Sequence, residues 1–214
     1  MRLLLPLLFL LVPVLANAQQ TMDKAYGEKI AEFTTDERFL NDLIDHLPAS
    51  DTVPSPLDYF GTIIGAEGIL HYTEDIYGYL RALADASPRV LVRNIGYSEE
   101  DREMIEVIIA DEATIANLEP YRIALNRLAD PRSLSEDEAS DIIATAKPIY
   151  YLTAGLHSGE TGSPEMVMEL AYRLAVEESN YIRSIRDNVI TMFTPAAEPD
   201  GRDRMVDVHR YSDD

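Results

Sequence analysis

The fold is decided by one stretch of the sequence, IYYLTAGLHSGETGSPEMVMELAYRL, which covers residues 149–174. Its first six residues predict a buried strand that ends at Ala154. A loop of small residues follows, and Ser163 and Pro164 then predict the start of a helix. Serine is a favoured capping residue, and proline is favoured at the first helical position. A strand that runs through a loop into a helix is typical of an α/β fold.

A second strand and loop follow in the same order. The apolar run Val189–Phe193 predicts another buried strand, and residues 195–201 form a turn-rich loop after it. In open α/β sheets, ligands bind beyond the carboxyl ends of the strands. Both loops occupy that place, so they are the expected location of a functional site.

The residues before this stretch predict a mixed β-sheet flanked by helices. Apolar residues from Ile76 to Ala84 fall on one side of a helix that Thr73 can cap. The other predicted elements are an antiparallel hairpin at residues 90–95 and 104–110 and two helices at residues 117–129 and 135–146. If the sheet continued beyond Asp214, the strand near Val189 would lack a neighbour and expose an edge.

The first eighteen residues, 1–18, predict a signal peptide. A charged start precedes an apolar run, Leu3–Leu15, and residues 16–18 have the small-x-small pattern that signal peptidase cleaves. The run is too short for a membrane-spanning helix, and no other segment is apolar enough to cross a bilayer. We therefore expect an exported protein, periplasmic or extracellular, without stable membrane insertion after cleavage.

Two further segments follow the signal peptide. Residues 19–65 predict a leader with one or two short helices, in which Phe39, Leu43 and Ile44 recur at helical spacing. A proline-containing connector at residues 51–56 lies near its end. We place the main domain at residues 66–214.

Composition excludes several classes of function. The formal net charge is -20, from 18 Lys and Arg against 38 Asp and Glu, and such a surface repels nucleic acid and anionic lipid. The acidic clusters lack the spaced pattern of a calcium loop. The chain has no cysteine, so disulfides, thiolate metal sites and catalytic thiols are excluded.

One of the four histidines has a context that suits a metal. His46 and His71 are expected to be a surface residue and a structural residue. His157 lies in the loop after the first predicted strand, three positions before Glu160, and the glycines of that loop permit a tight turn. An imidazole and a carboxylate suit zinc, and two histidines with one glutamate form a catalytic zinc set with an open position for water. Taken alone, the pair could also be a surface histidine and a glutamate favoured at a helix start.

Three motifs in order resemble the zinc carboxypeptidase family. The loop GLHSGETGSPE at residues 155–165 is similar to the metal-binding loop of that family, and residues 72–98 resemble its opening helix and strand pair. The segment TPAAEPDGR at residues 194–202 resembles the Asn-Pro-Asp-Gly turn of the family, with Glu198 in place of asparagine. The resemblance covers roughly residues 66–205 and implies that His157 and Glu160 are two ligands of one zinc ion.

The resemblance also implies an activity that this chain does not complete alone. A zinc-activated water would cleave a C-terminal peptide bond of a peptide or protein substrate. The family's third ligand, a histidine, its Asn-Arg pair for the substrate carboxylate and its glutamate base are expected beyond Asp214. Catalytic and substrate-binding residues are therefore unassigned here, the sheet is expected to be truncated after the first half of the domain, and the chain by itself is expected to be inactive.

Other interpretations stay open at this stage. His209 lies among charged residues without a strand to place it, and we do not assign it as the third ligand. The arginines at positions 202, 204 and 210 fit either a carbonyl-polarising role or ion pairs with Asp200, Asp203 and Asp207. At the level of function, a zinc deacylase or amidase and an inactive carboxypeptidase-like binding module are the alternatives.

Overall fold

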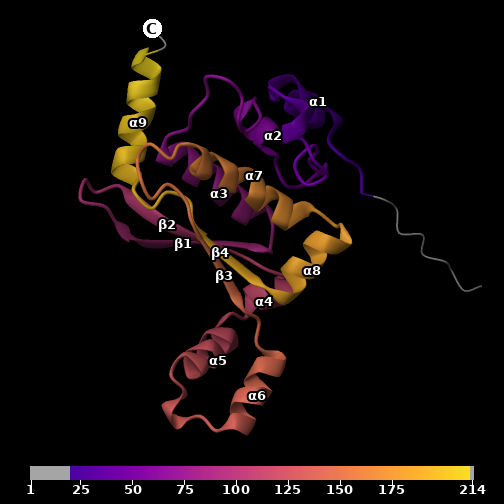
Figure 1. Cartoon of the computed structure of the whole chain (residues 1–214), viewed down its shortest axis with the longest axis vertical. Helices are drawn as coiled ribbons and strands as arrows, with labels where there is room; N and C mark the ends of the chain where they lie inside the picture. Colours follow the sequence, from indigo (N-terminus) through magenta and orange to yellow (C-terminus); the bar gives the residue numbers. More distant parts are fainter. Residues whose placement is uncertain (1–19, 213–214) are drawn as a thin grey trace, which may run out of the picture.

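A four-stranded mixed sheet organises the computed structural model, which describes residues 20–212 (Figure 1). The predicted signal peptide therefore lies outside the described residues. The strand order is β1-β2-β4-β3; β1–β2 and β2–β4 are antiparallel, and β3 is parallel to β4. The strands are β1 (Val90–Tyr97), β2 (Glu103–Ile109), β3 (Ile149–Thr153) and β4 (Ile190–Thr194). The predicted mixed sheet flanked by helices is confirmed.

The predicted hairpin is also confirmed. β1 and β2 pair from Val90 opposite Ile109 to Tyr97 opposite Glu103, with one irregularity near Gly96. Ile105, Val107 and Ile109 are every second residue of β2, so they share one face of the sheet, and all three are buried. This hairpin supplies the face on which the main helices pack.

The burial predicted for the strand at residues 149–154 is wrong. β3 is a strand, but Ile149, Tyr150 and Tyr151 are exposed. β3 is an edge strand that pairs with β4, and the helices pack elsewhere, α3 against β1 and α7 against β2. The edge expected near Val189 is likewise corrected, because β4 lies inside the sheet between β2 and β3.

Two long helices cover one face of the sheet and enclose the main core (Figure 1). They are α3 (Thr73–Ala86) and α7 (Gly162–Val176). Each presents an apolar stripe at helical spacing, as amphipathic helices do. The buried side chains include Ile76, Leu80 and Leu83 on α3, Val167, Met168 and Ala171 on α7, and Phe193 on β4.

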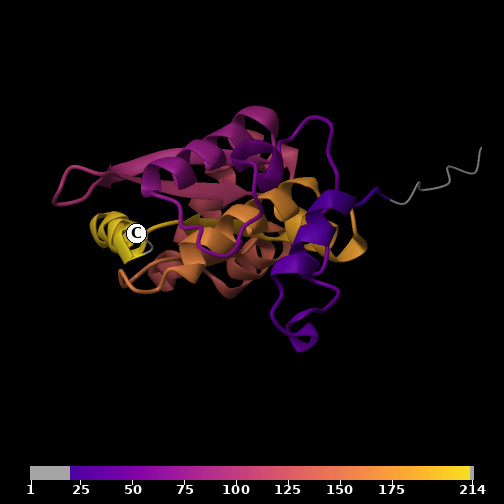
Figure 2. The same cartoon turned by 90° about the horizontal axis from the view of Figure 1, so that it is seen from above.

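The N-terminal segment packs on the same core, beyond α3 and α7 as seen from the sheet (Figure 2). It contains α1 (Lys24–Phe33), the 3-10 turn η1 (Glu37–Phe39) and α2 (Pro56–Phe60). Tyr26 and Leu47 are fully buried. The helical spacing at residues 39–47 does not form a helix, because the Asn41 side chain accepts the Leu43 N–H and turns the chain. The division drawn at residue 65 stays a prediction.

A helical insertion between β2 and β3 projects from one end of the molecule (Figure 1). It contains α4 (Glu112–Ala116), α5 (Glu119–Ala129), the 3-10 turn η2 (Pro131–Ser133) and α6 (Glu136–Thr145). No residue of α5 or α6 is buried. At its base, Asp111 pairs with Lys147 and accepts the Thr114 N–H at 3.1 Å, which begins α4.

Two helix starts differ from the sequence-based expectation. Ser163 is not the cap of α7, because that helix begins at Gly162 and the Ser163 hydroxyl accepts the Gly155 N–H instead. The predicted loop at residues 195–201 is shorter than expected, because α9 (Pro199–Ser212) begins within it. Glu198 accepts the Gly201 N–H at 2.9 Å, and Pro199 is the first helical residue.

The last helix before β4 is α8 (Asn180–Asn188), which delivers the chain from α7 back to the sheet. Its Arg186 is buried and donates to the carbonyl oxygens of Leu174 and Glu177. This anchors the crossover that makes β3 and β4 parallel. Within residues 20–212, no helix is long and apolar enough to span a membrane.

Candidate metal centre

The loop between β3 and α7 begins at a tight turn that requires glycine. Gly155 has φ of 59°, in the left-handed region that favours glycine. A Cβ added there would lie 2.9 Å from the Pro164 ring, so a larger residue would push the loop away from α7. The Gly155 N–H also donates to the Ser163 hydroxyl oxygen at 3.0 Å. The start of the loop is therefore fixed against the first turn of α7.

His157 and Glu160 face each other within this loop. The His157 Nδ1 lies 2.7 Å from Glu160 Oε1, and the His157 N–H donates to Glu160 Oε2 at 3.2 Å. The backbone closes the same turn, with the Glu160 N–H donating to the His157 carbonyl at 3.0 Å. The hydrogen bonds from His157 lower the pKa of Glu160, which keeps this carboxyl ionised. Both side chains are exposed, 74% for His157 and 51% for Glu160.

The loop after β4 lies directly against the His157 loop. Because β3 and β4 are parallel neighbours, their carboxyl ends reach the same edge of the sheet. Backbone hydrogen bonds join the two loops, from Ala197 N–H to the Ala154 carbonyl at 2.8 Å and from Glu198 N–H to the Gly155 carbonyl at 3.2 Å. A side-chain bond adds to them, since the Ser158 hydroxyl donates to Glu198 Oε2 at 2.9 Å.

A buried charged cluster holds the far end of the loop. Arg202 of α9 is only 2% exposed and donates to the carbonyl oxygens of Thr161 at 3.0 Å and His71 at 2.8 Å. It also forms an ion pair with Glu165 of α7. Glu165 in turn accepts the His71 N–H at 2.9 Å and lies 2.7 Å from His71 Nδ1. The cluster joins α7, α9 and the residues before α3.

Sequence reasoning missed this cluster, although its residues were noted one by one. The structural role expected for His71 is supported by its burial. Arg202 was left between a carbonyl-polarising role and an ion pair with a nearby aspartate, and its ion pair is with Glu165 instead of an aspartate. The sequence shows only that His71 and Arg202 lie in separate segments on either side of residues 155–165. Spacing along the chain cannot predict that these two segments come into contact.

The other candidates lie away from the His157 and Glu160 pair. Arg204 pairs with Glu100, and the Arg210 guanidinium lies 4.4 Å from the centre of the Tyr72 ring. His46 lies beside Asp45 in the N-terminal segment. The aspartates proposed as partners of these arginines have other contacts: Asp200 and Asp203 bind Arg102, and Asp207 accepts from the Tyr72 hydroxyl.

The donor chemistry of the pair fits a zinc ion. A ring nitrogen and a carboxylate oxygen are the ligand atoms that zinc takes from histidine and glutamate, and here they converge on one point of the loop. Within residues 20–212, no group of three histidine, aspartate, glutamate or cysteine side chains could hold a metal ion. The described residues thus offer two donors and no third.

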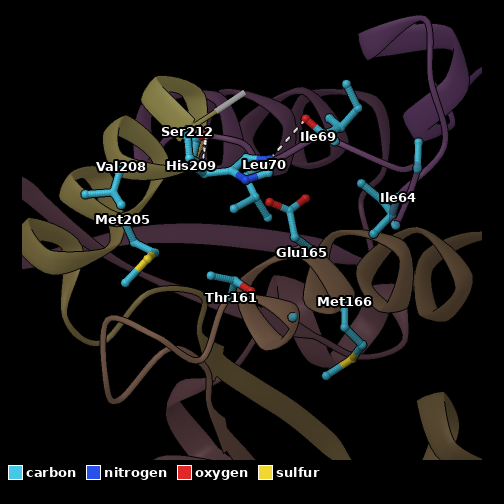
Figure 3. A pocket seen from close by; sticks show the side chains of 14 residues that line it. Ile64, Ile69, Leu70, Thr161, Glu165, Met166, Met205, Val208, His209 and Ser212 are labelled. Carbon is cyan, nitrogen blue, oxygen red and sulfur yellow. Dashed lines mark hydrogen bonds between the residues drawn. The ribbon is translucent and has the colours of Figure 1, made fainter. Parts of the chain in front are cut away.

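A cavity of about 690 Å³ borders the far end of the same loop (Figure 3). Thr161 and Gly162, which follow Glu160, form part of its wall, and the Glu165 carboxylate points towards it. His209 of α9 lies on another wall, with its Nε2 3.2 Å from the Gly68 carbonyl oxygen. Apolar side chains such as Met166 complete the lining. His209 thus belongs to this cavity.

Comparison with known families decides the family of the chain. A family profile described as zinc carboxypeptidase matches residues 76–212, which is more than half of the chain. The chain belongs to the zinc carboxypeptidase family. The resemblance read from the sequence is therefore confirmed, and the family is one of metal-dependent hydrolases of peptides. Comparison with curated proteins finds no significant match.

Solved structures similar to this family member include carboxypeptidases. Carboxypeptidase A from Helicoverpa armigera is 21% identical, with a TM-score of 0.44, over 67% of this chain and 27% of that protein. A protein described as a carboxypeptidase A from Shewanella denitrificans OS-217 is 21% identical, with a TM-score of 0.43, over 62% and 27%. Thrombin activatable fibrinolysis inhibitor is 16% identical, with a TM-score of 0.46, over 73% and 30%. The chain spans less than a third of the length of these structures.

Proposed function

We propose that this chain carries the first part of the metal site of an exported zinc carboxypeptidase. His157 and Glu160 would hold one zinc ion, together with a third protein ligand from outside these 214 residues. The observation that carries the proposal is the 2.7 Å approach of His157 Nδ1 to Glu160 Oε1, at the carboxyl end of β3, in a chain of this family. Among the described residues, no third side chain joins His157 and Glu160, so the proposal requires that the third ligand come from another part of the protein.

The chemistry of the proposed site is hydrolysis of a peptide bond. A bound zinc ion supplies a water of lowered pKa and a Lewis acid for a carbonyl oxygen. The contribution of this chain is to present an imidazole and a carboxylate on a turn whose backbone is closed by its own hydrogen bonds. Their exposure leaves room for a substrate and for a third ligand. The general base and the carboxylate-binding residues stay unassigned.

Hydrolysis assays with the full-length protein test this proposal. We expect one zinc per chain and release of the C-terminal residue from an N-blocked dipeptide with a free carboxylate. The same dipeptide with an amidated C-terminus should be resistant, because a carboxypeptidase binds the terminal carboxylate. Glu160→Gln and His157→Ala should each lose zinc and activity. Cleavage of N-acyl amino acids alone would favour a deacylase, and a protein that binds no zinc would favour an inactive binding module.

Export is a separate part of the proposal, supported by the sequence of residues 1–18. We expect the mature protein in the periplasmic or culture fraction, with Gln19 as its first residue. Amino-terminal sequencing or intact-mass measurement of that fraction tests the expectation. A cytosolic protein that retains Met1 would contradict it.

A further inference from the structure

Every polar group of Glu198 has a hydrogen-bond partner, and two of these groups, the N–H and Oε2, contact the loop at residues 154–161, called the metal loop below. Its N–H donates to the Gly155 carbonyl at 3.2 Å, and its carbonyl accepts the Arg202 N–H at 3.1 Å. Its carboxylate is divided between two donors, with Oε1 on the Gly201 N–H at 2.9 Å and Oε2 on the Ser158 hydroxyl at 2.9 Å. Both carboxylate oxygens therefore have partners inside the two loops.

Ser158 is the residue of the metal loop that binds the Glu198 side chain. It lies next to His157 and two positions before Glu160, and it is partly buried although both of those residues are exposed. Among the described residues, its bond to Glu198 is the side-chain hydrogen bond that ties residues 156–160 to the loop after β4, whereas the 3.4 Å bond from the Ser163 hydroxyl to the Glu160 carbonyl ties them to α7. The Ser158 bond therefore fixes the loop tip on the side of α9.

The hydrogen bond between Ser158 and Glu198 is closely packed against Gly201. A Cβ added to Gly201 would overlap both Glu198 Oε2 and Ser158 Oγ. The first turn of α9 can approach the metal loop this closely only because residue 201 has no side chain. The hydrogen bond from Ser158 to Glu198 is therefore part of a close contact between two loops, in which the side chains have little freedom to move.

We propose that Glu198 is a positioning residue for the metal pair and acts through Ser158. The inference rests on the proposed zinc site. Metal ligands on an exposed loop lose affinity when the loop must be ordered on binding, and outer hydrogen bonds that hold the ligands in place remove that cost. Glu198 supplies such a bond from a rigid helix start. Its carboxylate is directed to the two loops, so it sets the geometry of the site and not its substrate preference.

Zinc affinity of the full-length protein tests the inference. We expect Ser158→Ala and Glu198→Ala each to raise the dissociation constant for zinc about 10- to 100-fold, measured by competition with a chromophoric chelator. The double variant should be no weaker than either single variant, because the two side chains act as one pair. Glu198→Gln should stay within about threefold of the parent, since an amide can accept from Gly201 and donate to the Ser158 hydroxyl oxygen.

Two controls separate positioning from general effects. Glu99→Gln removes the same charge from an exposed position outside the two loops and should leave zinc affinity unchanged. Each zinc-free variant should melt cooperatively within about 5 °C of the parent, which shows that the fold is intact and allows for the lost bond from Glu198 to the Gly201 N–H.

The outcomes distinguish this inference from the proposed function. A parent protein that binds zinc as tightly as its Ser158→Ala and Glu198→Ala variants would overturn the positioning role and leave the zinc site standing. Glu198→Gln as weak as Glu198→Ala would also overturn it, because charge and not the hydrogen bond would then matter. A parent that binds no zinc would refute the zinc site and, with it, the inference.

Discussion

The loops around the metal pair and the α5–α6 insertion are both exposed, but they are held in different ways. Hydrogen bonds of Glu198 and Arg202 to the metal loop and its neighbours join residues 37 to 131 positions apart in the sequence. Among residues 119–138 of the insertion, comparable bonds join residues 2 to 11 positions apart. The exposed pair of His157 and Glu160 is thus supported by long-range contacts, whereas α5 and α6 are stabilised locally.

This difference predicts which substitutions affect the stability of the protein most. The supports of the metal loop include Glu165 and Arg202, which are buried, and removing one member leaves the other as an unpaired charge. The ion pairs of α5 and α6 are exposed to water, and such pairs contribute little. We therefore expect substitutions near the site to have large effects and those in the insertion to have small ones.

The largest effect is expected from Arg202→Met. The change leaves Glu165 buried without its cation and frees the carbonyls of Thr161 and His71, so we expect a loss of about 3–5 kcal/mol in the free energy of unfolding. Urea denaturation of the full-length protein measures it. Arg204→Met, on the exposed side of the same helix, is the matched control and should have little effect. A loss below about 1 kcal/mol for Arg202→Met would contradict a supporting role for the cluster.

A smaller effect is expected at the base of the insertion, from Asp111→Asn. Burial acts to raise the pKa of Asp111, but hydrogen bonds from Lys147 and Thr114 outweigh it and lower the pKa to about 2. Asparagine can still cap α4, but it loses the ion pair with Lys147, so we expect a loss of about 1–2 kcal/mol at pH 7. A lowered folded-state pKa adds stability above the unfolded value of 3.8, and this stability is lost as the pH falls from there towards 2.

Denaturation curves of parent and variant between pH 2 and pH 7 check this prediction. The difference between them should shrink as the pH falls through that window. A constant difference would show that the Asp111 carboxylate does not titrate as a paired group.

A third prediction concerns Glu169 on the outer side of α7, where the Tyr26 hydroxyl donates to its carboxylate at 2.8 Å. Burial raises the pKa of Glu169 above 4.5, although the Tyr26 hydrogen bond opposes this. The folded state therefore holds the proton more tightly than the unfolded state. This contribution is fully present below pH 4.5 and is lost as the pH rises through the folded-state pKa.

Glu169→Gln should abolish the loss of stability that accompanies ionisation of Glu169, and it should keep the hydrogen bond with Tyr26. We expect the variant to be more stable than the parent at pH 8, by on the order of 1 kcal/mol, and nearly equal to it below pH 4. Thermal denaturation across this pH range measures the difference, with exposed Glu67→Gln as the control. A variant less stable than the parent at pH 8 would show that the ionised carboxylate is the stabilising form.

The smallest effect is expected from Arg122→Gln in α5. It removes an ion pair with Glu119 in which both side chains are 60% exposed. We expect no measurable change in the free energy of unfolding or in zinc affinity. A loss as large as that of Asp111→Asn would show that the insertion depends on its surface pairs.

Local signals in the sequence predicted most of the elements but not their partners. Residues 90–110 predicted the hairpin because β-branched residues surround a turn, and the spacing of His157 and Glu160 in a glycine-containing loop predicted the donor pair. The start of α9 was missed, although Glu198 and Pro199 carry the same signal as Ser163 and Pro164, a side chain that can accept followed by proline.

The exposure of β3 and the buried cluster around Arg202 could not be predicted in this way. An apolar strand has the same composition at an edge of a sheet as in its centre, and strand order is set by pairing between distant segments. Arg202, Glu165 and His71 come from three parts of the chain, and only the packing of α7 and α9 brings them together. Spacing in the sequence therefore predicts the pairing of His157 with Glu160 but not the buried residues that pack beneath their loop.

The most direct test of the zinc site is a crystal structure of the full-length protein with diffraction data collected at the zinc absorption edge. We expect one anomalous peak about 2.0–2.2 Å from both His157 Nδ1 and a Glu160 carboxylate oxygen, the distances usual for zinc with these ligands. A peak at another place, or no peak in crystals grown with zinc, would contradict the assignment of His157 and Glu160 as its ligands.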